Sequence, residues 1–400
     1  MVRYITMGAS ILCIWILISG CTMMKTVSIV NSGEAISPYP AESSIPFNMK
    51  AHLIIVKARV NSSKEFNFIL DTAALTMVDQ KIASELGLDG EVEVDLNDSA
   101  GKTKKVKLAR LGSLSVGDIK VKDSPAAIAD LSDFGFDGIV GSSFLRHFRV
   151  TIDYKHRLLT FSDGKKRVPL NGGGVAIKFK PEMTHGFAPK IECTVDNSLD
   201  IDAFIDTGHP GIALPTEIVQ ESKEFKKGNF LESYGSMSSG LAGASDKDYL
   251  LRMNSLSLGK LELTDVPCSS TGIRQALIGA RALSHFLVTL DYPAGEMFLK
   301  RYENDKYETN VYSWGLALKR DKDRMVVKGV MKDSPADKSG IKVGNEVFTV
   351  NSLDVKQLPM IDLMALSLDD GIDRVELVYS GDGGRKTVVL KKEMLLPVVK

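Results

Sequence analysis

The sequence predicts a mainly β protein made of two related β-lobes, followed by a smaller domain that mixes helices and strands. Three observations support this fold class. Glycine is abundant, at 34 residues, and many short stretches alternate apolar and polar residues between Gly, Asn and Asp turns. Several motifs recur in the same order, 135 to 142 residues further along the chain. The repeat stops near residue 303, and 400 residues exceed what one compact core usually holds.

The charge balance excludes nucleic acid as the expected partner. Lys and Arg together number 50, as do Asp and Glu, so the chain has no net field that attracts polyanions. No basic run is interleaved with aromatic residues. The search for function therefore turns to local motifs.

Residues 1–20 are expected to form a lipoprotein signal peptide. An apolar stretch, Ile11–Ile18, is too short to span a bilayer comfortably. It leads into Ser19-Gly20-Cys21, which resembles the lipobox of bacterial lipoproteins. The alternative is an ordinary signal peptide with an incidental Cys. Lipid on Cys21 implies anchoring in the bacterial cell envelope, in the periplasm or at the outer membrane, without a spanning helix. Residues 21–45, rich in Ser and Pro, are expected to be a tether.

The internal repeat defines two lobes, at residues 46–170 and 171–303. Three blocks of the first lobe have counterparts in the second: Asp71-Thr72-Ala73 in Asp206-Thr207-Gly208, Leu111–Gly117 in Met253–Gly259, and Gly138–Tyr154 in Ala276–Tyr292. Chance similarity does not preserve the order of three blocks, so the lobes arose by duplication.

The first and third blocks carry chemistry. Asp-Thr-Gly after an apolar strand, followed later by an apolar-apolar-Gly strand, resembles the pepsin-like and retropepsin-like aspartic peptidases. The resemblance implies acid-protease-like β-barrel lobes with a two-carboxylate site at their interface. It assigns the dyad to Asp71 and Asp206, and the bracing of the two loops to Thr72 and Thr207. A peptidase of this kind needs no metal and no cofactor.

Glycines near each Asp have a spatial reason. Gly141 and Gly279 end the second apolar strand, which must pass beside the catalytic loop and has no room for a side chain. Gly208 lets a backbone N–H approach its carboxylate, and Ala73 replaces glycine at the matching position. That replacement is mild if Ala73 has a negative φ and costs on the order of 1 kcal/mol if φ is positive. It is also the feature that favours an alternative function, a catalytically inactive peptide-binding or scaffold protein.

Several other residues are candidates for supporting roles. His209 lies close enough in sequence to influence the dyad, although a surface turn is its simpler role. Turns at 98–102 and 238–245 are candidate flaps over the cleft. Cys193 and Cys268 are the thiols left after the signal peptide and Cys21, and whether they form a disulfide stays open. No metal-ligand motif is present.

Residues 308–400 resemble the PDZ domains of bacterial envelope proteases, through Ser334-Pro335-Ala336 and Gly344-Asn345-Glu346-Val347. The resemblance implies that Trp314-Gly315-Leu316 binds a peptide carboxylate. The peptide would add a strand beside the edge that ends at Leu318. Met364, on a helix-like stretch, is a candidate lining residue for the side-chain pocket. The alternative is a domain that only packs on the lobes.

The sequence therefore predicts an envelope-anchored aspartic endopeptidase. Its expected partners are peptide or unfolded protein substrates, and peptide or protein C-termini bound by the last domain.

Overall fold

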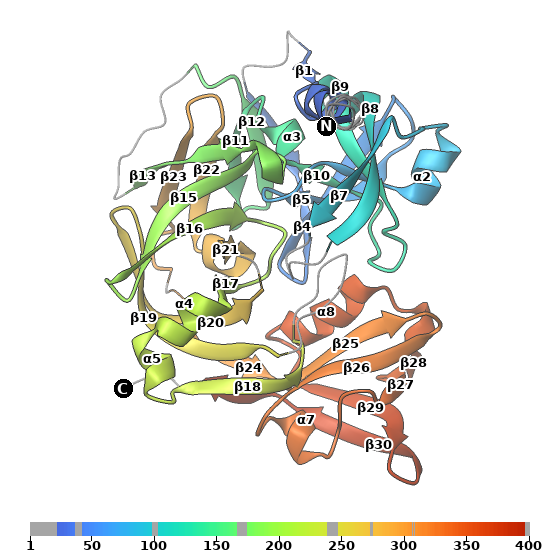
Figure 1. Ribbon diagram of the computed structural model, residues 1–400, viewed down its shortest axis with the longest axis vertical. Coiled ribbons are helices and arrows are strands. Elements are labelled where there is room, and N and C mark those ends of the chain that lie inside the picture. Colours follow the sequence, from blue (N-terminus) through green and yellow to red (C-terminus); the bar gives the residue numbers. More distant parts are fainter. Residues whose placement is uncertain are drawn as a thin grey trace, which may run out of the picture.

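The computed structural model describes residues 22–36, 42–97, 103–165, 174–237, 247–272, 275–305, 307 and 309–396. Figure 1 shows two β-lobes side by side, with the C-terminal region below them. The predicted fold class is confirmed, because strands dominate all three parts. The signal peptide, Cys21 and both candidate flaps lie outside the described residues.

The first lobe is a β-sheet in which strands distant in sequence pair. Its strand order is β1-β9-β6-β10-β5-β4-β8-β7, with β3 beside β4. Alternating burial along β4 and β8 places one face of each strand in the core. The bounds are β1(Glu34–Ala35), β3(Asn48–Lys50), β4(Leu53–Val60), β5(Phe66–Asp71), β6(Met77–Asp79), α2(Gln80–Glu85), β7(Val92–Asn97), β8(Thr103–Val116), β9(Ile119–Ala129), β10(Gly138–Gly141) and α3(Ser142–Leu145).

The second lobe repeats this topology. Its strand order is β14-β15-β16-β21-β17-β20-β19-β18. Strand by strand this corresponds to the path β3-β4-β5-β10-β6-β9-β8-β7 in the first lobe, where β9 also pairs with β8. The parallel pair β16–β21 takes the place of β5–β10. The bounds are β14(Lys180–Glu182), η1(Met183–His185), β15(Ala188–Val195), β16(Leu199–Asp206), β17(Ile212–Pro215), α4(Thr216–Glu221), α5(Lys223–Lys226), β18(Phe230–Gly235), β19(Tyr249–Leu258), β20(Leu261–Thr271), β21(Ala276–Gly279) and α6(Ala280–Leu283).

A third sheet joins the lobes and reveals the pseudo-twofold axis of the duplication. Its central pair is β11 against β22, in which Thr151 faces its own repeat counterpart, Thr289, with hydroxyl oxygens 2.9 Å apart. A buried ion pair, Arg149 with Asp291, closes one end of this pair. The strand order is β13(Val175–Lys178), β23(Glu296–Arg301), β22(Phe286–Asp291), β11(Arg149–Asp153), β12(Leu158–Ser162) and β2(Glu42–Pro46). One apolar core runs through this sheet into both lobes.

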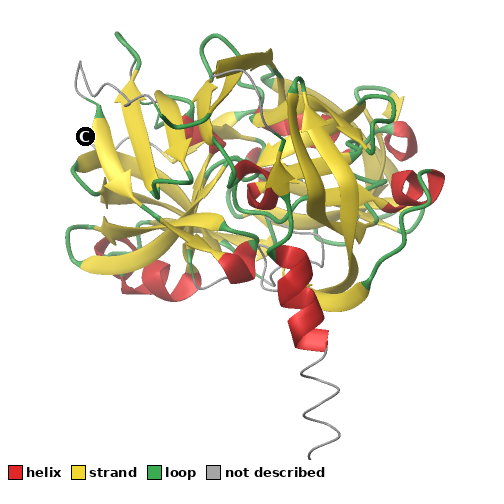
Figure 2. Cartoon of the chain, turned by 90° about the horizontal axis from the view of Figure 1, so that it is seen from above, coloured by secondary structure: helices red, strands yellow, loops and turns green. Residues whose placement is uncertain are grey.

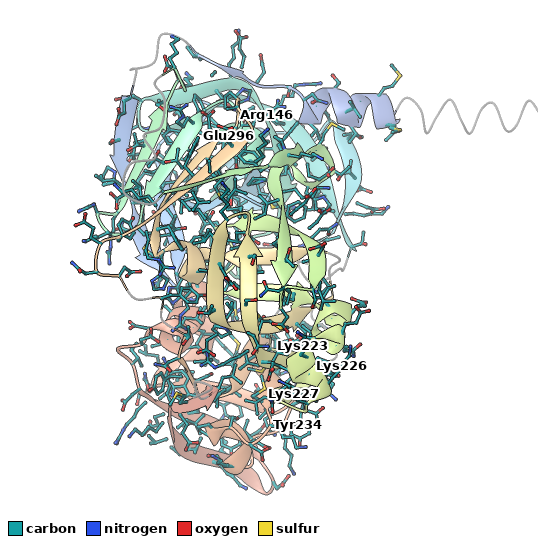
Figure 3. The ribbon with its side chains drawn as sticks, turned by 90° about the vertical axis from the view of Figure 1, so that its left-hand side faces the viewer. Arg146, Lys223, Lys226, Lys227, Tyr234 and Glu296 are labelled. Carbon is teal, nitrogen blue, oxygen red and sulfur yellow. The ribbon has the colours of Figure 1, made fainter. Side chains whose placement is uncertain are left out.

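The C-terminal region has an apolar core of its own, built around Trp314, Val330 and Leu377. It is attached to the second lobe by β18, which pairs with β26 through residues 233–235; the middle one, Tyr234, is labelled in Figure 3. Its elements are β24(Val311–Ser313), β25(Leu316–Asp321), β26(Arg324–Met331), α7(Pro335–Lys338), β27(Glu346–Val350), β28(Leu353–Asp354), η2(Val355–Gln357), α8(Met360–Leu368), β29(Arg374–Gly381), β30(Gly384–Lys391) and β31(Glu393–Leu396).

The tether predicted for residues 21–45 was wrong over the part that the structure describes. Residues 22–30 form a helix, visible in Figure 2, whose Ile29 is fully buried against the first lobe. The Arg146 guanidinium donates to the Asn31 and Ser32 carbonyl oxygens, and β1 and β2 join two different sheets. Burial of Ile29 and these hydrogen bonds outweigh the low order expected from Ser and Pro content.

None of the helices in the described ranges has the length and apolarity needed to cross a bilayer.

Candidate active site

The two aspartates stand at the ends of equivalent strands. Asp71 ends β5 and Asp206 ends β16, each after a run of buried apolar residues that anchors the loop. The apolar-Gly strands run parallel beside them, with Gly141 opposite Asp71 and Gly279 opposite Asp206. A methyl group on either glycine would overlap the backbone of the adjacent catalytic loop, which explains why both positions lack a side chain.

Thr72 and Thr207 tie the two loops together. The Thr72 hydroxyl donates to the Ile205 carbonyl oxygen at 2.5 Å and accepts from the Thr207 N–H at 3.0 Å. The Thr207 hydroxyl mirrors it, donating to the Leu70 carbonyl oxygen at 2.8 Å and accepting from the Thr72 N–H at 3.1 Å. Both side chains are fully buried. Four hydrogen bonds related by the pseudo-twofold axis fix the relative position of the aspartates.

The two carboxyl groups lie close together across the lobe interface, because the Asp71 carboxylate packs against Gly208, whose N–H donates to Asp206. Each also accepts a hydrogen bond from its own loop: Ala73 N–H to Asp71 at 2.9 Å, and Gly208 N–H to Asp206 at 2.8 Å. Burial raises the pKa of Asp206 to about 6. Burial and the charge of Asp206 hold the pKa of Asp71 well above its usual range. The pair therefore retains a shared proton at a pH where isolated carboxyl groups have lost theirs.

The small residues after the aspartates are not equivalent. Ala73 has no positive φ, so its methyl group causes no backbone strain, and it packs against the second-lobe cluster formed by Phe204 and Leu277. At Gly208 a methyl group would overlap the Asp71 carboxylate. The Asp71 carboxylate therefore packs directly against Gly208, which leaves no room for a side chain there. The matching position of the first loop has room for the methyl group of Ala73.

A second asymmetry involves residues that the sequence reasoning did not single out. The Ser142 hydroxyl, directly after Gly141, donates to the Thr72 carbonyl oxygen at 2.6 Å and contacts the Tyr292 hydroxyl at 2.6 Å. The counterpart of Ser142 is Ala280, and the counterpart of Tyr292 is Tyr154. The buried Tyr154 hydroxyl has no hydrogen-bond partner among the residues that the structure describes. Aligning the two repeat copies position by position would have revealed both pairs.

His209 occupies the repeat position of Ala74. The carbonyl oxygens of these two residues accept from Ala280 and Ser142, the residues that follow the apolar-Gly strands. The imidazole Nδ1 lies 2.9 Å from the Gly211 carbonyl oxygen, and burial lowers the pKa of the ring. His209 is therefore half-buried beside the dyad rather than on an exposed surface turn.

The remaining candidate groups are structurally simple. Cys193 and Cys268 are buried free thiols. In the described ranges, no group of three or more His, Cys, Asp or Glu side chains is arranged to hold a metal ion.

In the predicted carboxylate loop of the C-terminal region, hydrogen-bond donors of Trp314 and Gly315 already have partners within the region. Trp314 is buried and its indole N–H donates to the Asp373 carbonyl oxygen at 3.2 Å, while the Gly315 N–H donates to the Ser313 hydroxyl at 3.0 Å. Leu316 and Leu318 pack at the rim of the core on β25, which in the described part of the sheet pairs only with β26. Its other edge faces α8. Met364, the candidate lining residue of the side-chain pocket, packs against the apolar cluster of the first lobe.

This combination, two β-lobes with paired carboxyl groups at their interface, defines an aspartyl protease-like domain. Residues 56–144 match a family model described as aspartyl protease. Among solved structures, the chain is similar to Basic 7S globulin from soybean, with 11% identity, a TM-score of 0.41, and coverage of 65% of this chain and 94% of that one. No curated protein matches the sequence.

Proposed function

We propose that this protein is an aspartic endopeptidase that cleaves peptides or unfolded proteins with water activated by Asp71 and Asp206. The observation that carries the proposal is the placement of the two carboxyl groups side by side at the lobe interface, on loops tied by four symmetric threonine hydrogen bonds. The family match over residues 56–144 supports the same class of function.

The geometry suggests how the two carboxyl groups divide the work. In the proposed mechanism Asp71 holds the shared proton and Asp206 is the base, because the interaction between the carboxyl groups raises the pKa of Asp71 and lowers that of Asp206. The base takes a proton from water as the water oxygen attacks the peptide carbonyl carbon, and Asp71 protonates the carbonyl oxygen. Collapse of the tetrahedral diol breaks the C–N bond: the leaving amine takes the proton from Asp206, and one diol hydroxyl returns a proton to Asp71. The products are a free carboxyl group and a free amine, one water is consumed, and the dyad returns to its starting protonation state.

Asparagine substitution tests the dyad. Asp71→Asn and Asp206→Asn each remove half of the shared-proton pair while keeping the side-chain shape, so hydrolysis of an unfolded protein substrate should fall at least about 10³-fold. Circular dichroism should show an unchanged fold. Full activity in either variant would exclude the dyad as the catalytic site.

The rival function is an inactive peptide-binding scaffold, suggested by Ala73. The negative φ of Ala73 and its N–H bond to Asp71 count against it, because the substitution leaves the loop geometry intact. A scaffold would bind unfolded peptides equally well with and without Asp206→Asn and would cleave none.

We further propose that Cys21 is lipidated and anchors the protein in a bacterial envelope, in the periplasm or at the outer membrane. The lipobox-like Ser19-Gly20-Cys21 supports this location. Cys21→Ser should move the protein from the membrane fraction to the soluble fraction; a variant that stays with membranes would exclude lipid as the anchor.

Binding of peptide C-termini by the C-terminal region is also proposed, at the edge of β25 that faces α8. The Gly315 N–H already has a partner, so a carboxylate must replace the Ser313 hydroxyl. Calorimetry on the full chain should show at least about tenfold weaker binding for an amidated apolar peptide than for its free acid. Equal affinities would leave only a packing role for the region.

A further inference from the structure

Two apolar patches flank the dyad at equivalent positions of the lobes. In the first lobe the patch contains Leu53, Ile69, Met77 and Ile139, and in the second it contains Ala188, Phe204, Ala213 and Leu277. Ile69 and Phe204 each stand two residues before their aspartate, and side chains two apart along a strand share a face. The patches therefore lie on the same face of each sheet as the carboxyl groups, where a peptide across the dyad must place its side chains.

The first-lobe patch is covered by the C-terminal region. Ile361, in the first turn of α8, is 3% exposed and belongs to the same apolar cluster as Ile69 and Ile139. Three further α8 residues pack against this cluster: Met364, Ala365 and Leu368. Ala74 of the catalytic loop packs against it as well. In Figure 1, α8 lies directly below the first lobe, on the border between the two lobes.

The seat of α8 is built from specific backbone contacts. The Met360 N–H donates to the Asp133 carbonyl oxygen at 2.8 Å, and the Ile361 N–H donates to the Phe134 carbonyl oxygen at 3.1 Å. The first-turn N–H groups of a helix have no partner within the helix, so the first lobe supplies the missing acceptors. Gly135, with φ of +89°, accommodates Pro359, since a methyl group on Gly135 would overlap that proline ring.

Charged groups hold both ends of the helix. Near its start, Lys50 of the first lobe forms an ion pair with Asp362. Just past its end, Asp370 pairs with Arg281 of the second lobe at 3.5 Å. The Arg281 N–H donates to the Pro210 carbonyl oxygen, one residue from His209. Helix α8 thus spans from the first lobe to the loop that carries Asp206.

We propose that α8 is an autoinhibitory element, in which Ile361 occupies the first-lobe patch in place of a substrate side chain. This inference rests on the proposed peptidase function. The dyad is fully formed in the structure, so what limits hydrolysis is access to the patch beside Asp71. Release of α8 exposes the patch without rearranging the catalytic loops.

The test measures binding separately from cleavage. An apolar peptide with a non-hydrolysable bond at its centre is titrated, by fluorescence anisotropy, against the full chain and two variants. Ile361→Asp, which puts a charge in the patch, should bind the peptide at least about tenfold more tightly than the unaltered chain. The control is Leu353→Asp, which changes a 56% exposed apolar residue of the same region and should leave affinity unchanged. Equal affinity of the unaltered chain and Ile361→Asp overturns the proposal.

A charge exchange at the Lys50–Asp362 ion pair tests the same contact without a substitution in the apolar core, in case Ile361→Asp does not fold. Lys50→Glu breaks the ion pair with Asp362 while leaving both apolar cores intact, and should tighten peptide binding about threefold. The double variant Lys50→Glu/Asp362→Lys restores the pair and should return the affinity to its starting value. Unchanged binding in Lys50→Glu counts against the autoinhibitory contact.

Cleavage of an unmodified apolar peptide then separates the two proposals. Ile361→Asp should raise kcat/KM at least about tenfold, and adding Asp206→Asn should abolish the activity. If Ile361→Asp binds the peptide more tightly but no variant cleaves it, the peptidase function is overturned, while the proposal that α8 covers the first-lobe patch is supported. Cleavage with the same kcat/KM in the unaltered chain and Ile361→Asp overturns the autoinhibitory contact alone.

Discussion

The two catalytic loops share one framework but differ in what surrounds each carboxyl group. Both are tied by the same pair of threonine hydrogen bonds, and both lie beside an apolar-Gly strand in the same register. The first loop is additionally braced by Ser142 and Tyr292, whereas the second has Ala280 and an unpartnered Tyr154 hydroxyl. Duplication thus preserved the positions of the carboxyl groups while their surroundings diverged, and unequal surroundings are what give two identical side chains different roles.

The sharpest way to break this comparison is to exchange the small residues. Gly208→Ala should lower kcat at least about 100-fold, because the added methyl group overlaps the Asp71 carboxylate, and misplacement by about 1 Å costs this much. Ala73→Gly should change kcat less than about threefold, since Ala73 has no positive φ to relieve. Steady-state kinetics on one peptide measures both. Comparable losses in the two variants would show that the loops are equivalent after all.

The raised pKa values predict that the dyad destabilises the protein at neutral pH. Since the folded-state pKa of Asp206 exceeds its unfolded value, the stabilising contribution is complete below pH 4 and is lost as the pH rises through about 6. Asp206→Asn does not titrate, so it should match the unaltered chain near pH 4 and be more stable near pH 7. The expected difference is on the order of a few kcal/mol, because the substitution removes the Asp206 titration and also the charge that raises the pKa of Asp71.

Denaturant unfolding at pH 4, 5.5 and 7 measures this difference. Lys300→Gln, in the inter-lobe sheet and away from the dyad, is a control whose effect on stability should not depend on pH over this range. A stability gap for Asp206→Asn that is constant with pH would show that the dyad is not buried as described.

The smallest effect concerns the contact between Ser142 and Tyr292, which supports the first loop only. Ser142→Ala leaves the buried Thr72 carbonyl and the Tyr292 hydroxyl without this partner, and should destabilise the fold by about 1–3 kcal/mol. Ala280→Ser offers the Tyr154 hydroxyl the partner that it lacks and should stabilise by up to about 1 kcal/mol. Thermal unfolding of both variants compares the lobes directly. Destabilisation by Ala280→Ser would mean that this site has no room for the mirrored bond.

Much of the dyad region was predictable because its determinants are local. An apolar strand followed by Asp-Thr and a small residue encodes a buried strand and a tight loop within a few positions. The repeat supplied the second copy, and hence the expectation that the two loops face each other. In the structure Asp71 and Asp206 lie near each other, with Thr72 and Thr207 between the two loops. Their catalytic role stays a prediction until the asparagine variants are assayed.

The sequence by itself determined the β-rich lobes, their duplication and the two carboxylate loops, since each depends on residues close in the chain. Tertiary structure alone decided the contacts between distant segments. The helix at 22–30 packs on the first lobe where a tether was expected, and α8 turns Ile361 and Met364 toward that lobe. An apolar helix face has the same sequence pattern whether it lines a groove or packs on a neighbouring domain. Only the surface that it meets determines which, because hydrophobic burial has no direction of its own.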